Sequence, residues 1–300
     1  MVEGKQELAT NSFSPSTDMK IKPKLILAGP TWPLTGYPSA KREWSIERKV
    51  SELKAAGFKA FGGRLSTPGV LAASMRHKIP VLAYEDIGGI KEIRPKLTSI
   101  AEAGSPMINI QPGDHDTRTE RAVRIVVAVM RESEKLGINS HIEIHRDTAT
   151  ETPEKSFAII DGYKRETGKD LPVCWDHSHF AVVKHLNPDN YVERLVVRRR
   201  LIQLSQQFHM RPFNGHHCQV PVTNGKGRLS PEFKDWIPYV DAMFDCWLAG
   251  PRPGNSLWVV PELGPPIGYG LSCFPDVFND LKVCRREVLK SWNRALKRTT

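Results

Sequence analysis

Short runs of apolar, β-branched residues alternate along this chain with longer segments whose apolar residues recur every third or fourth position. Residues 24–30 read KLILAGP, and residues 44–58 then place Ile46, Val50, Leu53 and Phe58 near one helical face. Continuous apolar runs are typical of buried parallel strands. A three-and-four spacing predicts an amphipathic helix. The first 58 residues therefore predict a strand followed by a helix.

The same alternation continues to the last helix. It predicts strands over residues 24–30, 59–66, 80–86, 106–113, 140–148, 171–180, 211–222 and 256–265. It predicts helices over residues 44–58, 67–78, 90–104, 118–137, 153–168, 187–208, 230–250 and 274–298, the third broken near Pro95. Eight strand–helix units are the composition of a (β/α)8 TIM barrel.

The alternative architecture is an open, doubly wound sheet. Such a sheet usually has a Gly-x-Gly-x-x-Gly turn after its first strand, whereas Gly29, Pro30 and Thr31 stand there in this chain. We therefore expect a single-domain TIM barrel of the α/β class over residues 23–300. Residues 1–22 are polar, and we expect them to form a flexible N-terminal arm.

Polar side chains follow four successive strands of this predicted barrel. The fifth strand carries His141, Glu143 and His145, and the sixth carries Trp175, Asp176 and His179. The seventh carries His216, His217 and Gln219, and the eighth ends at Glu262. The carboxyl ends of barrel strands form the active site in this fold. We expect these side chains to meet there.

The acidic groups among them lie in apolar sequence, and burying a lone carboxylate is costly. A shared divalent cation would neutralise several carboxylates at once. Oxygen and nitrogen donors without thiolates suit Mn²⁺, Mg²⁺ or Co²⁺, and Zn²⁺ is an alternative. A single strand-end glutamate is more often a salt bridge, for example Glu143 with Arg146. The conjunction of four strand ends favours a metal site.

These residues resemble the xylose isomerase-like TIM barrel superfamily, which includes sugar isomerases, ketose 3-epimerases and an apurinic endonuclease branch. The resemblance matches Glu143 in HIEIHRDT, Asp176 and His179 in WDHSH, and Glu262 in VPELGP. It implies that Glu143, Asp176, Gln219 and Glu262 hold the metal, with His216 or His217 as alternatives to Gln219. An Asp that usually follows the seventh-strand ligand is replaced here by Val222 and Thr223.

The resemblance also implies an activity, which is the isomerisation or epimerisation of a sugar by proton transfer through an enediolate. Glu143 and Glu262 would exchange the proton, and His179 would hold or polarise a substrate oxygen. A sugar dehydratase or lyase would use the same step. The residues expected to bind the carbohydrate are His145, Arg146, His217, Trp32 and Trp175. Dimers and tetramers are common in the family.

The net charge of +10, from 43 basic and 33 acidic residues, raises the question of nucleic acid. A metal-dependent endonuclease acting at abasic sites would need further His and Asp ligands. Asn224, Gly225 and Lys226 stand where an Asp-x-His would be expected, so we do not expect nucleic acid as a partner. Much of the basic charge is dispersed over the faces of predicted outer helices, for example in residues 193–203 and 282–298, although Arg64, Arg146 and Lys226 could reach the rim.

The five cysteines are widely spaced, and no Cys-x-x-Cys, apolar leader or membrane-length apolar run is present. We expect a reduced, cytoplasmic protein with no membrane partner.

Overall fold

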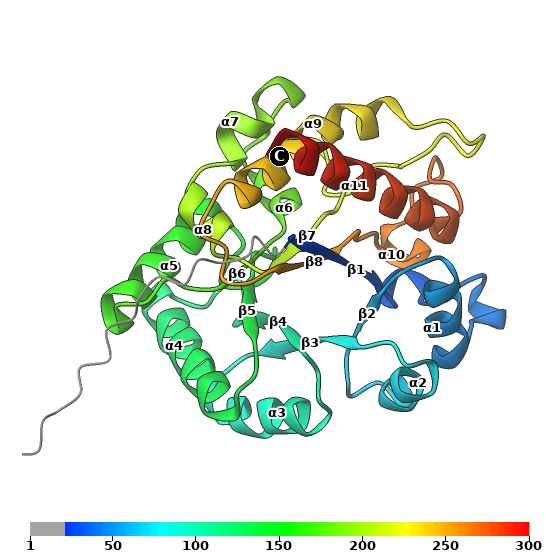
Figure 1. Ribbon diagram of the computed structural model, residues 1–300. Helices are drawn as coiled ribbons and strands as arrows, with labels where there is room; N and C mark the ends of the chain where they lie inside the picture. Colours follow the sequence, from blue (N-terminus) through cyan, green and yellow to red (C-terminus); the bar gives the residue numbers. More distant parts are fainter. Residues whose placement is uncertain (1–21, 300) are drawn as a thin grey trace, which may run out of the picture.

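The computed structural model describes residues 22–299, which form a closed barrel of eight parallel strands in sequence order. Strand β8 pairs with β1, Leu257 opposite Leu25, and this pairing closes the barrel. The longer helices form an outer ring around the strands (Figure 1). The predicted (β/α)8 TIM barrel is confirmed. Nearly all of the arm predicted at residues 1–22 lies outside the described residues.

The strands are β1 (Lys24–Pro30), β2 (Ala60–Gly63), β3 (Val81–Ile87), β4 (Met107–Pro112), β5 (Ser140–Glu143), β6 (Val173–Trp175), β7 (Gln207–His209) and β8 (Ser256–Val260). The α-helices are α1 (Ile46–Ala55), α2 (Val70–His77), α3 (Ile90–Glu102), α4 (Thr119–Leu136), α5 (Pro153–Thr167), α6 (His177–Val183), α7 (Tyr191–Leu195), α8 (Arg199–Gln203), α9 (Pro231–Leu248), α10 (Pro266–Tyr269) and α11 (Val277–Thr299). The 3₁₀ helices are η1 (Trp32–Leu34), η2 (Ala40–Arg42) and η3 (Pro188–Asn190).

Two apolar clusters hold the barrel together. The large cluster lies between the strands and the helices, and includes Leu27 of β1 and Leu53 of α1. A small separate cluster contains Ala28 of β1 and Trp258 of β8. Leu27 and Ala28 belong to different clusters because successive strand residues point to opposite faces of a sheet. No helix within residues 22–299 is long and apolar enough to cross a bilayer.

The seventh unit differs most from the sequence prediction. The helix expected over residues 187–208 is broken into η3, α7 and α8, with Arg198 in the left-handed region at φ 45°. Strand β7 then begins at Gln207, so the prediction of a strand at 211–222 is wrong. Residues 211–222, which carry the polar side chains assigned to that strand, form a loop. The strand is only three residues long, and its single apolar residue, Phe208, gives little pattern.

The predicted break near Pro95 is also wrong, because α3 runs through this residue. A proline in a helix removes one backbone hydrogen bond and crowds the preceding turn. The buried face formed by Ile93, Leu97 and Ile100 holds this helix on the barrel.

Candidate active site

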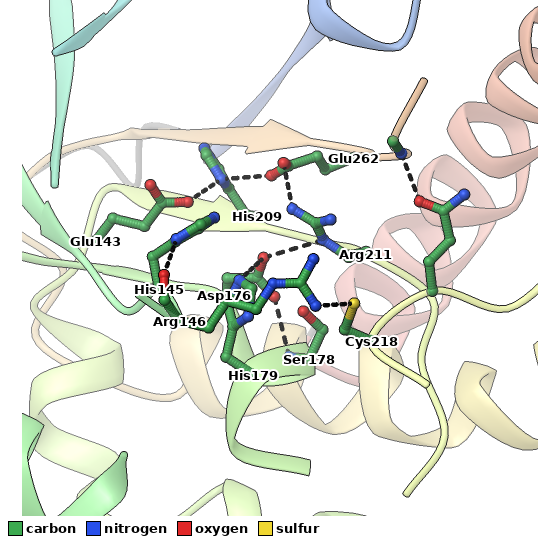
Figure 2. A network of polar contacts seen from close by, with 12 residues as sticks. Glu143, His145, Arg146, Asp176, Ser178, His179, His209, Arg211, Cys218 and Glu262 are labelled. Atoms are coloured by element: carbon green, nitrogen blue, oxygen red, sulfur yellow. Dashed lines mark hydrogen bonds and ion pairs between the residues drawn. The ribbon is translucent and has the colours of Figure 1, made fainter. Parts of the chain in front are cut away.

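Three carboxylates and one imidazole converge where the last four strands end. Glu143 and His209 are the final residues of β5 and β7, Asp176 directly follows β6, and Glu262 lies two residues beyond β8. One ligand atom from each of the four lies within 4.8 Å of all the others, and all four residues are buried. The carboxyl ends of the barrel strands therefore bring together a compact group of side chains that could hold a metal ion (Figure 2).

His209 stands between two of the carboxylates. Its Nδ1 lies 2.7 Å from Oε1 of Glu143 and 2.7 Å from Oε2 of Glu262. Burial disfavours a charged ring, but the adjacent Cys174, Glu143 and Glu262 raise the pKa of His209 well above its ordinary value. The second ring nitrogen, Nε2, lies 3.4 Å from Nε2 of Gln207. The Gln207 amide oxygen has no partner, and a rotated amide would accept a hydrogen bond from the ring.

Glu143 is held by two amides as well as by His209. Asn109 and Gln111 of β4 both donate to Oε2 of Glu143, at 2.7 Å each. Burial would raise the pKa of Glu143, but the interaction with His209 outweighs it and lowers the pKa to about 2. The carboxylate is thus kept ionised, with one oxygen on the amides and one toward His209.

Asp176 is positioned by the start of helix α6. One of its oxygens accepts a hydrogen bond from the backbone N–H of Ser178 at 2.9 Å, the arrangement of a helix cap. Its other oxygen, Oδ2, lies 3.3 Å from Nε2 of His179. Burial would raise the pKa of Asp176, but His179 and Arg211 lower it below its usual range. The Asp-x-x-His spacing therefore places both side chains in the same site.

Arg211 is a buried cation that the sequence analysis did not identify. Its Nε lies 3.3 Å from Oδ2 of Asp176, and its Nη2 is paired with Oε1 of Glu262. The side chain is fully buried, and its Nη1 has no hydrogen-bond partner. The guanidinium carbon lies 5.5 Å from the ring centre of Trp32 and 5.9 Å from that of Tyr269. Arg211 therefore supplies a permanent positive charge beside two of the three carboxylates.

Neither His209 nor Arg211 was expected from the sequence. His209 falls between the predicted helix at 187–208 and the predicted strand at 211–222, and Arg211 is the first residue of that predicted strand. Their spacing, His-x-Arg in HMR, was the available signal, because it places both side chains on one face of an extended chain. The sequence analysis placed the seventh strand too far along the chain, so it did not identify His209 as the end of that strand.

A cavity of about 420 Å³ opens onto this group. Its lining includes Glu143, His209 and Glu262 at one end, and Trp32 and Tyr269 as aromatic walls. The two aromatic rings meet edge to face, with their centres 4.9 Å apart. A concave site with convergent polar groups and flat apolar walls is the usual form of a small-molecule site.

Several residues proposed from the sequence lie at this site. Glu143, Asp176 and Glu262 belong to the four-residue group, and His179 contacts Asp176. Trp32 and His145 line the cavity. Arg146 lies behind Tyr269, where its Nη2 donates to the phenolic oxygen and its Nη1 lies 2.8 Å from Sγ of Cys218.

The residues proposed for the seventh strand lie elsewhere. Gln219 accepts a hydrogen bond from the backbone N–H of Gly264 and lines a second cavity. His217 is exposed and its ring contacts Asn214, while His216 packs against His185. None of the three belongs to the four-residue group, because the segment that carries them is a loop beyond β7.

Trp175 is not a wall of the cavity. Its side chain is 1 % exposed and belongs to the large apolar cluster, with its ring centre 5.1 Å from that of His177. Trp175 is the last residue of β6, and its side chain points away from the barrel interior because Asp176, the next residue, points into it.

The donor set fits a divalent cation. His209 Nδ1 and Glu262 Oε2 are buried, and neither forms a hydrogen bond of good geometry despite their short separation. Three carboxylates and an imidazole suit Mn²⁺, Mg²⁺ or Co²⁺. Cys174 lies close to Glu143 and His209, but burial raises the pKa of its thiol to about 12. A protonated thiol is a poor ligand, so the carboxylate set is the better candidate.

No protein-family model and no curated protein sequence matches this chain. Solved structures do match in fold. An L-ribulose 3-epimerase matches with a TM-score of 0.60 and 12 % identity, over 93 % of this chain and 97 % of that chain. A D-allulose 3-epimerase from Methylomonas sp., solved with D-allulose, matches with a TM-score of 0.56 and 11 % identity, over 89 % and 97 %.

A xylose isomerase-like TIM barrel protein from Mycobacterium smegmatis, solved with magnesium, matches with a TM-score of 0.51 and 11 % identity, over 90 % of this chain and 98 % of that chain. The resemblance to the xylose isomerase-like barrels found in the sequence is therefore confirmed at the level of the fold.

Proposed function

We propose that this protein is a divalent-metal-dependent epimerase or isomerase of a sugar or keto-sugar. The observation that carries the proposal is the convergence of Glu143, Asp176, His209 and Glu262 within 4.8 Å at the carboxyl ends of four strands. These four residues would hold Mn²⁺, Mg²⁺ or Co²⁺, with His209 in the place expected for Gln219. The fold shared with two sugar 3-epimerases supports the choice of a carbohydrate substrate.

The bound ion would polarise a carbonyl oxygen of the substrate and orient the adjacent hydroxyl. Glu143 and Glu262 supply the proton transfer. They lie on opposite sides of His209, each 2.7 Å from its Nδ1, so they can approach a bound sugar from two directions (Figure 2). One carboxylate removes the proton next to the carbonyl and the other returns it, which passes the sugar through an enediolate.

Other residues would bind and orient the sugar. His179, one helical turn beyond Asp176, would donate to a substrate oxygen, because its buried ring nitrogens form no hydrogen bond of good geometry within the protein. Burial also lowers its pKa, which favours the neutral ring. Trp32 and His145 line the cavity, and Arg146 fixes Tyr269 through its hydroxyl. A flat indole can pack against the C–H face of a sugar while its neighbours bind hydroxyls.

The experiment is a screen of ketoses and keto-glycosides in deuterated water. The protein is first freed of metal with a chelator, and it is then assayed without metal and with Mn²⁺, Mg²⁺ or Co²⁺ added. We expect a metal-dependent gain of one mass unit in a recovered sugar, because the removed proton is replaced from solvent. An unchanged mass for every sugar with every metal would refute the proposal. A product that has lost one water would instead identify the dehydratase that shares the enediolate step.

The glutamates can be tested with a matched control. Glu262→Gln should lower kcat by on the order of 10²-fold or more, since it removes a proton-transfer group. Glu287→Gln is the control, because Glu287 is equally buried but lies on α11 and contacts Arg286 and Lys290. A near-normal rate in Glu262→Gln would contradict its role.

The arrangement of possible metal ligands does not favour the alternative hypothesis of an abasic-site endonuclease. Residues 22–299 contain two groups of three or more side chains that could hold a metal ion, and both groups include Glu143 and His209. A single centre suits a sugar better than a multi-metal phosphodiester site. Cleavage of an abasic DNA duplex by the metal-loaded protein would overturn this choice.

A further inference from the structure

The cavity at the active site is larger than one monosaccharide. A hexose of six CHOH units displaces on the order of six water volumes, roughly 180 Å³ at about 30 Å³ per water. The cavity measures about 420 Å³. A single hexose at the four-residue group would therefore not fill the cavity.

The remaining space extends toward the first two units of the barrel. Its lining includes Ile46 and Lys49 of α1, and Arg64 and Thr67 from the segment after β2. Glu143, at the reactive end, lies on β5. Figure 1 shows β5 and α1 on different sides of the barrel axis. The cavity thus has a reactive end and a separate far end.

The far end carries paired charges. Nζ of Lys49 is paired with Oε1 of Glu43, and Nη2 of Arg64 lies 2.6 Å from Oδ2 of Asp86. A phosphate or carboxylate site uses cations or helix N-termini that are free to face the anion. Each of these two cations already faces a carboxylate. The carboxylates partly neutralise both cations, so the far end attracts an anion less than free cations would, whereas a hydroxylated neutral group can hydrogen-bond to the paired charges and to Thr67.

We propose that the natural substrate is a neutral glycoside of about disaccharide size, in which the reacting keto-sugar lies at the four-residue group and a second sugar unit occupies the far end. This proposal rests on the proposed function and adds the class of substrate. Ile46 and Thr67 contact the second unit, and the Lys49–Glu43 and Arg64–Asp86 pairs bind its hydroxyls.

Three ketoses that are identical at the reacting carbons test the proposal. They are D-fructose, D-fructose with a glucosyl group on O6, and D-fructose 6-phosphate, each with the Mn²⁺-loaded protein. Calorimetric titration measures binding, and solvent deuterium incorporation measures turnover. We expect the glucosyl compound to bind at least about tenfold more tightly than D-fructose, a difference of about 1.4 kcal/mol. The phosphate should bind no better than D-fructose. Equal binding of D-fructose and the glucosyl compound, or preference for the phosphate, would overturn the proposal.

Filling the far end gives a second test. Thr67→Trp should reduce binding of the glucosyl compound at least about tenfold and change D-fructose binding less than about twofold. Ser66→Trp is the control, because Ser66 is exposed in the same segment and is not part of the lining. Thr67→Gln repeats the test with a smaller side chain if the Trp variant has a lowered Tm. Unchanged glucosyl binding in a folded variant would also overturn the proposal.

The two readouts separate this inference from the proposed function. Preferential binding of the glucosyl compound without deuterium incorporation into any sugar would refute the proposed reaction and leave the substrate class standing. Deuterium incorporation with equal binding of all three compounds would support the reaction and refute the substrate class.

Discussion

Arg211 is the residue whose removal should change the site most clearly. Its guanidinium is fully buried and pairs with Asp176 and Glu262. Replacing it in Arg211→Met leaves both carboxylates without their permanent counter-charge. Removing one partner of a buried ion pair costs about 3–5 kcal/mol. For a chain of this length, that loss lowers Tm by about 5–8 °C, given an unfolding entropy of roughly 2 cal/mol/K per residue.

The same substitution should increase the response to metal. Without Arg211 the site holds one more uncompensated negative charge, so a divalent ion stabilises the folded variant more than the wild type. We expect Mn²⁺ to raise the Tm of the metal-free Arg211→Met variant more than it raises the Tm of the metal-free wild type. Thermal unfolding followed by circular dichroism, with and without Mn²⁺, measures both effects.

A surface arginine provides the comparison. Arg294 donates to both oxygens of Asp241, at 3.1 and 2.8 Å, but its side chain is 41 % exposed. Exposed ion pairs contribute about 0–1 kcal/mol, so Arg294→Met should barely change Tm. If Arg211→Met matched Arg294→Met in Tm and in its response to Mn²⁺, Arg211 would not be the counter-charge of the site.

Three further predictions address neighbouring features. His209→Ala should abolish Mn²⁺ binding in a titration, whereas Gln219→Ala should retain it, and the reverse result would restore the sequence-based ligand. Gln207→Leu should weaken Mn²⁺ binding about 10–100-fold, because it removes the group beside the second nitrogen of His209, and unchanged affinity would contradict this. Gly62→Ala should cost about 1–3 kcal/mol in urea unfolding, because a Cβ there would lie 1.9 Å from the Tyr84 hydroxyl, and wild-type stability would count against that contact.

The parts of the site that sequence could predict are those that follow well-patterned strands. Glu143 lies next to Ile142 and Ile144, and Glu262 follows Val259 and Val260. These apolar neighbours predict both the strand and the position of its end. His209 follows a strand of three residues with polar neighbours. A strand this short is defined by pairing with β6 and β8, which are distant in sequence, so local pattern could not place it.

The position of β7 also explains why one basic residue inside the barrel was missed. The sequence analysis placed basic residues on outer helices and acids within, and for Arg294 and Arg298, which pair with acids on α9, this holds. Arg211 is the exception, because it lies two positions beyond the last residue of β7 and its side chain returns to the barrel interior. Three buried carboxylates with one fixed cation leave a net charge of −2 when His209 is neutral. That net charge matches one divalent ion. The misplaced boundary of β7 therefore hid Arg211, the residue that sets the net charge of the site.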